Sequence, residues 1–176
     1  DQEQVNLTRF ELNLPEKRNF FLEGNDVYSQ KIRLFYSRWI ADIYGGVKIY
    51  GKSGKTEINA LSAQTKEDDI EGLSANFSVL RFKRDIRKSS TLGFVLANRY
   101  IDGKNTGALG LDTSLHFTPK YSFTSQFAIS YGEKNKYDLG FFIRPSYDSY
   151  TSHIHLRYTY LGMHFADHVN AVGFIR

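Results

Sequence analysis

Cysteine is absent from this chain of 176 residues, which also has only one Trp, one Met and three Pro. The lack of Cys excludes a disulfide scaffold, a thiol nucleophile and a zinc–thiolate site. No stretch reaches the roughly 18 consecutive apolar residues of a membrane-spanning helix. A transmembrane β-barrel stays open, because its strands alternate apolar and polar side chains and never need such a run. An initiator Met and a signal peptide are also missing from the start of the sequence, so we expect a mature or trimmed product.

The charge balance gives little support for a nucleic-acid partner. Lys and Arg number 23 against 19 for Asp and Glu, a formal net charge of +4. A nucleic-acid-binding surface gathers basic residues and exposed aromatic rings on one face. The basic residues here are dispersed, and their one cluster, Lys83, Arg84, Arg87 and Lys88, is expected near anionic head groups at a membrane edge. The length fits one domain, or a piece of a larger one.

Strand-length segments dominate the chain from residue 34 onward. Turn residues separate them at intervals of about 10–15 residues, which is typical of an all-β fold. No stretch sustains a helical period over several turns. The predicted strands cover residues 34–41, 44–51, 54–64, 76–86, 91–101, 107–117, 121–132, 137–147 and 152–161. Residues 76–86 sort poorly, since Phe77 and Val79 share a face with Arg81 and Lys83, and either a bulge or a strand that protrudes past a membrane would explain this.

The last four predicted strands each have one apolar and one polar face. In residues 121–132, for example, Phe123 and Phe127 alternate with Thr124 and Gln126. The dry core of a soluble sandwich would not tolerate the charges on the polar faces, whereas a wet interior would. We therefore assign the polar faces to an enclosed lumen. The candidate lumen-facing residues are Asp112, Ser114, His116, Gln126, Asp138, Arg144, His153, His155 and Arg157.

Two further features favour a membrane barrel over a soluble β-sandwich, which would also alternate. The segments run to about 10–11 residues, and a tilted strand needs about 9–11 to cross a bilayer. Tyr121, Tyr131, Tyr137 and Tyr147 stand at the ends of apolar rows, as in the aromatic girdles of outer-membrane barrels. We predict an all-β fold that is an antiparallel transmembrane β-barrel, or the N-terminal part of one with about eight strands, preceded by a short irregular plug or linker segment.

A long motif lies near the start of the chain. It consists of residues 10–24 (FELNLPEKRNFFLEG) and 34–38 (LFYSR), with weaker counterparts at 46–52 (GVKIYGK) and 77–81 (FSVLR). These stretches resemble the DUF5916-like outer-membrane β-barrel domain of unknown function of Bacteroidota and related Gram-negative bacteria, which normally follows a carbohydrate-binding-like periplasmic domain. Asn19 and Trp39 depart from the family, which often has Pro and Arg there. The resemblance implies a preceding periplasmic domain and more strands after Arg176, and it offers no catalytic residues to carry over.

The organisation that follows has two parts. Residues 1–30 are expected to form a periplasmic linker or plug-like segment, and residues 31–176 to form barrel strands that are incomplete at the C-terminus. As a plug, the segment would pair Glu16, Arg18 and Glu23 with lumen charges, whereas as a linker it would be solvated. Its candidate residues are Pro15, Glu16, Lys17, Arg18, Glu23 and Arg38. We expect residues 118–120 to form a short periplasmic turn and residues 66–74 to form an external loop.

Several motifs imitate catalytic or metal sites. Residues 46–53 (GVKIYGKS) satisfy the phosphate-loop pattern, but their alternating β-branched and long side chains are typical of a strand, and no helix follows. His153 and His155 share one strand face, and His164 and His168 would lie together on a helix, yet no third metal ligand is tied to either pair by spacing. No Ser lies in a Gly-x-Ser-x-Gly elbow. We assign no catalytic residue, metal or cofactor.

The resulting hypothesis is an outer-membrane β-barrel protein with a polar lumen, in a structural role or in the transport of small solutes or glycans. Its partners would be outer-membrane lipid, small solutes or glycans, and a periplasmic N-terminal domain or partner protein, with no nucleic acid. One alternative is a membrane-associated hydrolase at the barrel rim, although the outward rows carry no His. The other is a soluble β-sandwich or ligand-binding barrel.

Overall fold

The computed structural model describes residues 16–24, 28–40, 42–67, 72–132 and 137–172, and within them the fold is all-β. The strands are β1 (Ile43–Ser53), β2 (Thr56–Thr65), β3 (Asn76–Arg87), β4 (Ser90–Ile101), β5 (Lys104–His116), β6 (Tyr121–Tyr131), β7 (Asp138–Asp148), β8 (His153–His155) and β9 (Tyr158–Leu161). Three short helical turns accompany them: α1 (Asn19–Leu22), η2 (Ser37–Trp39) and α2 (Phe165–Val169). No helix among these described residues is both long and apolar enough to cross a membrane.

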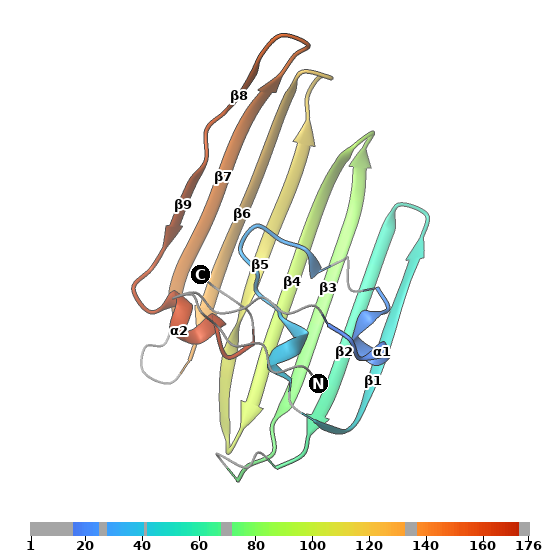
Figure 1. Ribbon diagram of the computed structural model, residues 1–176, viewed down its shortest axis with the longest axis vertical. Coiled ribbons are helices and arrows are strands. Elements are labelled where there is room, and N and C mark those ends of the chain that lie inside the picture. Colours follow the sequence, from blue (N-terminus) through green and yellow to red (C-terminus); the bar gives the residue numbers. More distant parts are fainter. Residues whose placement is uncertain (1–15, 25–27, 41, 68–71, 133–136, 173–176) are drawn as a thin grey trace.

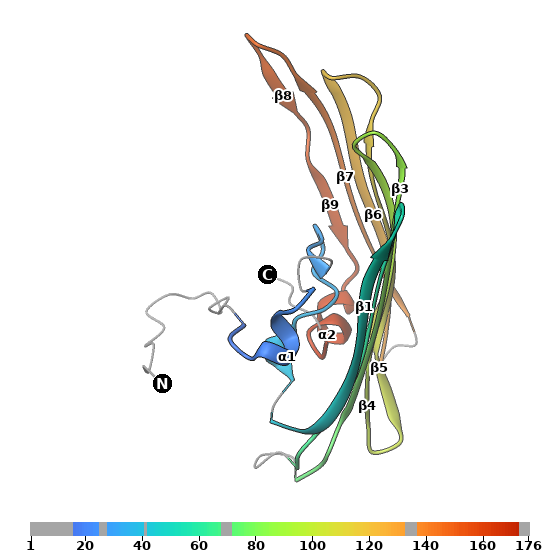
Figure 2. The same cartoon turned by 90° about the vertical axis from the view of Figure 1, so that its right-hand side faces the viewer.

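The strands form one antiparallel sheet that follows the order of the chain from β1 to β8, and β9 also pairs with β7 (Figure 1). The sheet curves so that one face is concave (Figure 2). β1 lies at one edge and β8 with β9 at the other, and these edges do not pair with each other in the described residues. The prediction of an antiparallel all-β fold is therefore confirmed, while the sheet as described is open.

The two ends of the sheet differ in their connections. One end, which we call the hairpin end, carries the turns β1–β2, β3–β4, β5–β6 and β7–β8. The opposite end, which we call the α2 end, carries the connections β2–β3, β4–β5 and β6–β7, and α2 lies toward it. At the α2 end Asp102 and Gly103 both have positive φ, of 48° and 77°, as a tight two-residue hairpin turn requires. Residues 118–120 lie at the hairpin end, and the described residues 66–67 and 72–74 lie at the α2 end.

The convex face of the sheet is apolar and exposed. Residues that face each other across neighbouring strands line up in two rows that run across the whole sheet. One row consists of Ile49, Ala60, Leu80, Leu96, Leu109, Ile129 and Leu139, and the next of Ile58, Phe82, Phe94, Leu111, Phe127, Phe141 and Tyr160. Leu111 is 51% exposed and Phe127 is 45% exposed, whereas Gln126, the residue before Phe127 in β6, is buried on the concave face. We call these two rows the apolar belt.

The concave face is covered by other parts of the same chain. Residues 16–24 and 28–40, with α1 and η2, lie against it, and so does α2 (Figure 2). One buried cluster joins Phe21, Tyr28, Phe35 and Ile40 to Leu61, Phe77, Val79 and Ala97 of the sheet. A second joins Ile32, Leu34, Phe165 and Val169 to Val95, Ala108, Ala128 and Phe142. The middle of the concave face is therefore a dry core rather than the wet surface that the polar faces predicted.

Residues 76–86 sort poorly in the sequence because β3 contributes to this core. Phe77 and Val79 are buried beneath the N-terminal segment, and Arg81 on the same face is buried by an ion pair with Asp112. A register shift does occur in β3, between Asp85 and Arg87, but it lies at the end of the strand and does not change the faces of these residues. Neither a central bulge nor a protruding strand is needed.

The prediction of a strand at residues 34–41 is wrong, because the described residues 34–40 form no strand of the sheet. Leu34, Phe35 and Ile40 are buried in the two clusters, and the backbone between them forms η2 instead of joining the sheet. The carbonyl oxygens of Ser37 and Ile40 accept hydrogen bonds from the Arg18 guanidinium at 2.8 and 2.7 Å. The apolar side chains of this segment therefore enter the core although its backbone is irregular. Hydrogen bonds from the Arg18 side chain to the backbone take the place of the hydrogen bonds that a neighbouring strand would supply.

The predicted strand at residues 152–161 is divided into β8 and β9. Both pair with β7 in the same register, so Leu156 lies opposite Pro145. Leu156 donates its N–H to the Pro145 carbonyl at 3.2 Å, but Pro145 has no N–H to return. The missing hydrogen bond interrupts the strand at the edge of the sheet, where a proline is tolerated.

Candidate functional site

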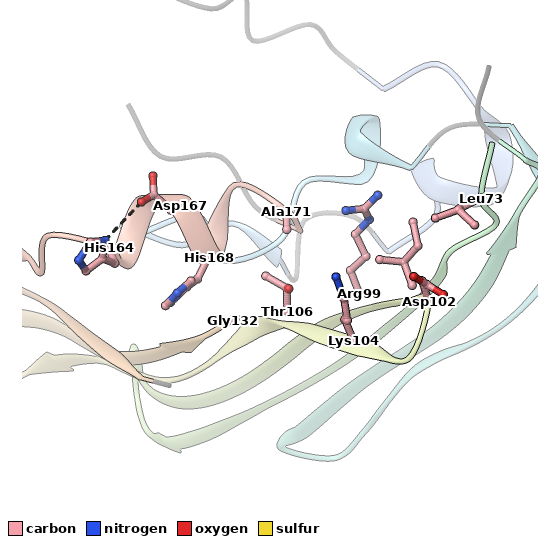
Figure 3. Close-up of a pocket in the computed structure, with 11 residues that line it drawn as sticks. Leu73, Arg99, Asp102, Lys104, Thr106, Gly132, His164, Asp167, His168 and Ala171 are labelled. Carbon is pink, nitrogen blue, oxygen red and sulfur yellow. Dashed lines mark ion pairs between the residues drawn. The ribbon is translucent and has the colours of Figure 1, made fainter. Parts of the chain in front are cut away.

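A cavity of about 690 Å³ opens at the α2 end of the concave face (Figure 3). Its walls come from the end of β4, the β4–β5 turn, the start of β5 and the residues around α2. The lining residues are Leu73, Arg99, Ile101, Asp102, Lys104, Thr106, Gly132, His164, Asp167, His168 and Ala171.

The wall formed by α2 is anchored to β6 by His168. This imidazole is buried, and its Nδ1 lies 3.1 Å from the Ser130 Oγ, which is completely buried. Phe165 and Val169 on the same helix enter the second core cluster. Gly132 makes room for the imidazole, since a Cβ at this position would lie 2.5 Å from the His168 Cδ2. A residue without a side chain is needed at Gly132 for this close approach.

The start of α2 is held by Asp138, a predicted lumen residue at the first position of β7. Its Oδ2 accepts a hydrogen bond from the His164 N–H at 2.7 Å, and its Oδ1 accepts one from its neighbour's N–H, that of Leu139, at 2.8 Å. The Gly162 N–H also binds the Leu139 carbonyl, at 2.8 Å. Asp138 therefore ties the chain after β9 to the sheet, which places the helix over the cavity.

Charged groups of both signs line this cavity. Arg99 and Lys104 extend from β4 and β5, with Asp102 in the turn between these strands (Figure 3). On the opposite wall His164 Nδ1 lies 3.6 Å from the Asp167 Oδ2. Such a mixture of donors and acceptors suits a hydrophilic solute that forms several hydrogen bonds.

The same cavity lacks the arrangement of a nucleophilic catalyst. The Ser130 hydroxyl is inaccessible beneath His168, and Asp167 contacts His164 rather than orienting His168. A Ser–His–Asp catalyst needs an exposed nucleophile and a base oriented by the acid. Among the described residues no group of three or more His, Asp and Glu is arranged to hold a metal ion. The geometry therefore favours binding over nucleophilic catalysis.

The other predicted lumen residues are distributed along the concave side. Gln126 is buried and clamps the backbone of Ile32: its Oε1 accepts the Ile32 N–H at 2.7 Å, and its Nε2 donates to the Ile32 carbonyl at 2.8 Å. Asp112 pairs with Arg81, and its Oδ1 and Oδ2 accept hydrogen bonds at 2.6 and 2.7 Å. Ser114 lines a second, smaller cavity beside them.

The remaining candidates lie farther from the core. Arg144 on β7 is partly buried, and its Nε atom has no hydrogen-bond partner among the described residues. His116 is exposed at the end of β5. His153, His155 and Arg157 are exposed at the β8–β9 edge, where the His153 Nδ1 lies 2.9 Å from the Asp148 Oδ1. The structure thus brings Asp112, Ser114 and Gln126 together and leaves these edge residues apart.

The predicted plug residues form a tether of their own. The Glu16 carboxylate accepts hydrogen bonds from the Arg18 side chain at 2.9 Å and from the Ser37 Oγ at 2.7 Å. Burial acts to raise the pKa of Glu16, but the bonds from Arg18 and Ser37 outweigh it and lower the pKa to about 2. Glu16 and Arg18 were expected to pair with lumen charges, but they pair with each other. Both also bind residues 37–40, so the start of the segment is held against its end.

The other members of that set play smaller parts. The Glu23 side chain is exposed, while its backbone carbonyl accepts a hydrogen bond from Lys48 of β1. Lys17 and Arg38 are exposed, and Pro15 lies outside the described residues. Further contacts fix the segment, as the Tyr28 hydroxyl donates to the Asn59 Oδ1 at 2.7 Å.

Several functional residues escaped prediction. Arg81 was grouped with apolar neighbours, and its partner is 31 positions away, so no local pattern links them. Arg99 lies in the predicted strand 91–101, whereas Lys104 and Thr106 fall between the predicted strands 91–101 and 107–117, and no sequence pattern placed these residues beside α2. The one available sequence feature was Gly132, which follows a long strand and could have indicated a close contact.

Comparison with known proteins gives one match. The family model described as Domain of unknown function (DUF5916) matches residues 1–60, which confirms the predicted resemblance over the N-terminal segment, β1 and the start of β2. Searches of the curated proteins and of the solved structures found no match.

Proposed function

We propose that this chain forms part of an outer-membrane β-barrel whose concave side is filled by its own N-terminal segment, with a structural role or a role in the transport of small solutes or glycans. The apolar belt carries this proposal. Fully burying one Leu or Phe side chain stabilises a protein by about 1.5–3 kcal/mol, and the belt leaves many of them exposed. Exposed apolar surfaces of this extent mark contacts with lipid or with another protein.

The positions of the tyrosines agree with a lipid boundary. Tyr121 and Tyr147 lie with ring centroids 4.9 Å apart on the convex face at the hairpin end. Tyr131 lies on the same face at the α2 end, where its hydroxyl donates to the Asn98 Oδ1 at 2.9 Å. Aromatic rings at both ends of an aliphatic band are typical of the two interfaces of a barrel in a membrane.

The open edges support the same proposal. β1 is 11 residues long, and its Val47 and Ile49 are about two-thirds exposed. An unpaired apolar edge of this length would aggregate in water, and closing a barrel removes such edges. The proposal therefore requires additional strands between β1 and the β8–β9 edge.

The two cavities favour a solute-handling role over a purely structural one. The core clusters that join residues 16–24 and 28–40 to the sheet lie between the cavity at the α2 end and the smaller cavity at the hairpin end. Both cavities have charged and hydroxyl-bearing walls, which hydrophilic ligands require. A solute that passes through the barrel would meet the N-terminal segment between them.

A substitution in the belt tests the membrane location. Leu111→Arg places a charge in the second row of the belt, which we expect to lie near mid-membrane, and it should destabilise the folded chain in phosphatidylcholine vesicles by about 2–4 kcal/mol. Asn105→Arg is the matched control on the same strand and face but near the interface, with an expected cost of about 0–1 kcal/mol. The measurement is the folded fraction on unheated gels against urea concentration.

Two results would contradict the proposal. One is extraction of the full chain from membranes by salt alone, without detergent. The other is equal harm from Leu111→Arg and Asn105→Arg, since a charge near mid-membrane should cost more than one near the interface.

A further inference from the structure

The cavity at the hairpin end, of about 260 Å³, is built from two distant parts of the chain. Residues 29–31 of the N-terminal segment form one wall, and the concave faces of β3 to β6 form the other. The clamp between Gln126 and Ile32 holds these walls together. The cavity is thus formed by tertiary contacts between the N-terminal segment and the sheet, and no single element encloses it.

Polar groups without partners surround this cavity. Both amide atoms of Gln30 are buried and form no hydrogen bond among the described residues. The half-buried side chains of Ser114 and Thr124 also line this cavity. Arg144, whose Nε is buried without a partner, lies opposite Thr124 in the β6–β7 ladder. Buried polar atoms are rarely left unpaired in folded proteins, so a bound solute or water is expected to satisfy them.

The charges around the cavity are predominantly positive. Arg81 and Asp112 neutralise each other through two short hydrogen bonds. Lys31 and Lys83 also line the cavity, and neither forms an ion pair within the described part of the chain. The nearest balancing carboxylate in the sheet register is Glu57, opposite Lys83 on β2. With Arg144 included, basic groups outnumber acidic ones in this part of the concave face.

We propose that this cavity binds the oxyanion group, a carboxylate or a phosphate, of a small hydrophilic solute. Lys31 and Lys83 supply the charge, Ser114 and Thr124 donate hydroxyl hydrogen bonds, and the Gln30 Nε2 donates to the oxyanion while its Oε1 accepts a hydrogen bond from a hydroxyl group of the same solute. Ionised acceptors form hydrogen bonds about twice as strong as neutral ones, which favours an oxyanion over a neutral sugar. The volume fits a solute no larger than a monosaccharide acid. This inference does not depend on the membrane location.

Titration calorimetry of the full chain folded in detergent micelles tests the proposal with three probes: inorganic phosphate, glucuronate and glucose. Phosphate and glucuronate should bind, and glucose should bind at least about tenfold more weakly, as the loss of one charge-assisted hydrogen bond implies. Stronger binding of phosphate than of glucuronate would identify a phosphate group, and the reverse order would identify a carboxylate. Absence of binding by both anions, or equal binding of glucose, would overturn the proposal.

Variants locate the binding in this cavity. Lys83→Gln should weaken both anions about tenfold, while Lys88→Gln, in the exposed turn that follows the same strand, should leave them unchanged. Gln30→Leu should also weaken binding, whereas unchanged anion affinity in this variant would show that the buried amide serves no ligand and would overturn the site. Ser114→Ala replaces Lys83→Gln if that variant fails to fold. Equal effects of the Lys83 and Lys88 substitutions would likewise overturn it.

Discussion

The buried ion pair between Arg81 and Asp112 gives the sharpest test of how the concave face is built. The guanidinium reaches from β3 to β5 across β4, and the pair lies directly over Gly93. The Arg81 side chain is 3% exposed and the Asp112 side chain 20%. We consider the substitution Arg81→Met, which keeps much of the side-chain volume but removes the charge and the hydrogen bonds.

The expected cost follows from the charge that remains. Removing one partner of a buried pair costs about 3–5 kcal/mol, because the other charge is left without compensation. Since the Asp112 carboxylate keeps some contact with solvent, we expect the lower end, about 3 kcal/mol. Urea unfolding of the full chain in detergent micelles measures this loss as a lower midpoint at an unchanged slope.

A double-mutant cycle separates the ion pair from general packing. Arg81→Met combined with Asp112→Leu should lose less stability than Arg81→Met alone, because no buried charge remains. Gly93→Ala should act through the same pair, since its methyl group would overlap the Asp112 Oδ2 and the Arg81 Nη1. In the uncharged double variant the Gly93→Ala penalty should disappear. A loss below about 1 kcal/mol for Arg81→Met, as at an exposed pair, or additive losses in the double variant would refute this reasoning.

Three further outcomes are expected. Gln126→Leu should lower the free energy of unfolding in urea by about 2–4 kcal/mol, because the Ile32 N–H and carbonyl both lose a buried partner; a loss no greater than that of an exposed substitution would contradict the clamp. Burial acts to raise the pKa of Glu16, yet its hydrogen bonds lower it from 4.5 to about 2, so its stabilisation is complete above pH 4.5 and is lost as the pH falls toward 2. In Glu16→Gln the urea midpoint should depend less on pH between pH 4.5 and 2. A pH dependence equal to that of the unmodified chain would contradict the lowered pKa of Glu16. Gly132→Ala should displace the His168 ring and cost about 1–3 kcal/mol in the same urea assay, and an unchanged urea midpoint would contradict the close contact.

Much of the sheet could be predicted from the sequence because strand alternation is a local property. In β6 the period of two places Phe127 on one face and Gln126 on the other whatever the strand pairs with. The structure bears this out, with Phe127 exposed and Gln126 buried. The division of the last strand into β8 and β9 was missed because it depends on the direction of the Pro145 backbone. Its carbonyl and its nitrogen point toward β8 and β9 rather than toward β6, and only the strand pairing determines this direction.

The N-terminal segment shows where local pattern misleads. Leu34 and Ile40 carry the spacing of a strand, but their side chains pack into the concavity, and the Ile40 carbonyl accepts a hydrogen bond from Arg18 instead of from a neighbouring strand. A short apolar run buries its side chains equally well in a strand or in an irregular core segment, so periodicity alone does not separate them.

By itself, the sequence determined the all-β class, most strand positions and the side chains that share a face, because these follow from a two-residue repeat along one strand. The tertiary structure alone decided which polar residues meet: Arg81 with Asp112 over Gly93, Gln126 with Ile32, and His168 with Ser130. These partners are 31 to 94 positions apart. Their meeting depends on strand register, on the curvature of the sheet and on the segment packed inside it, and no local pattern encodes those three.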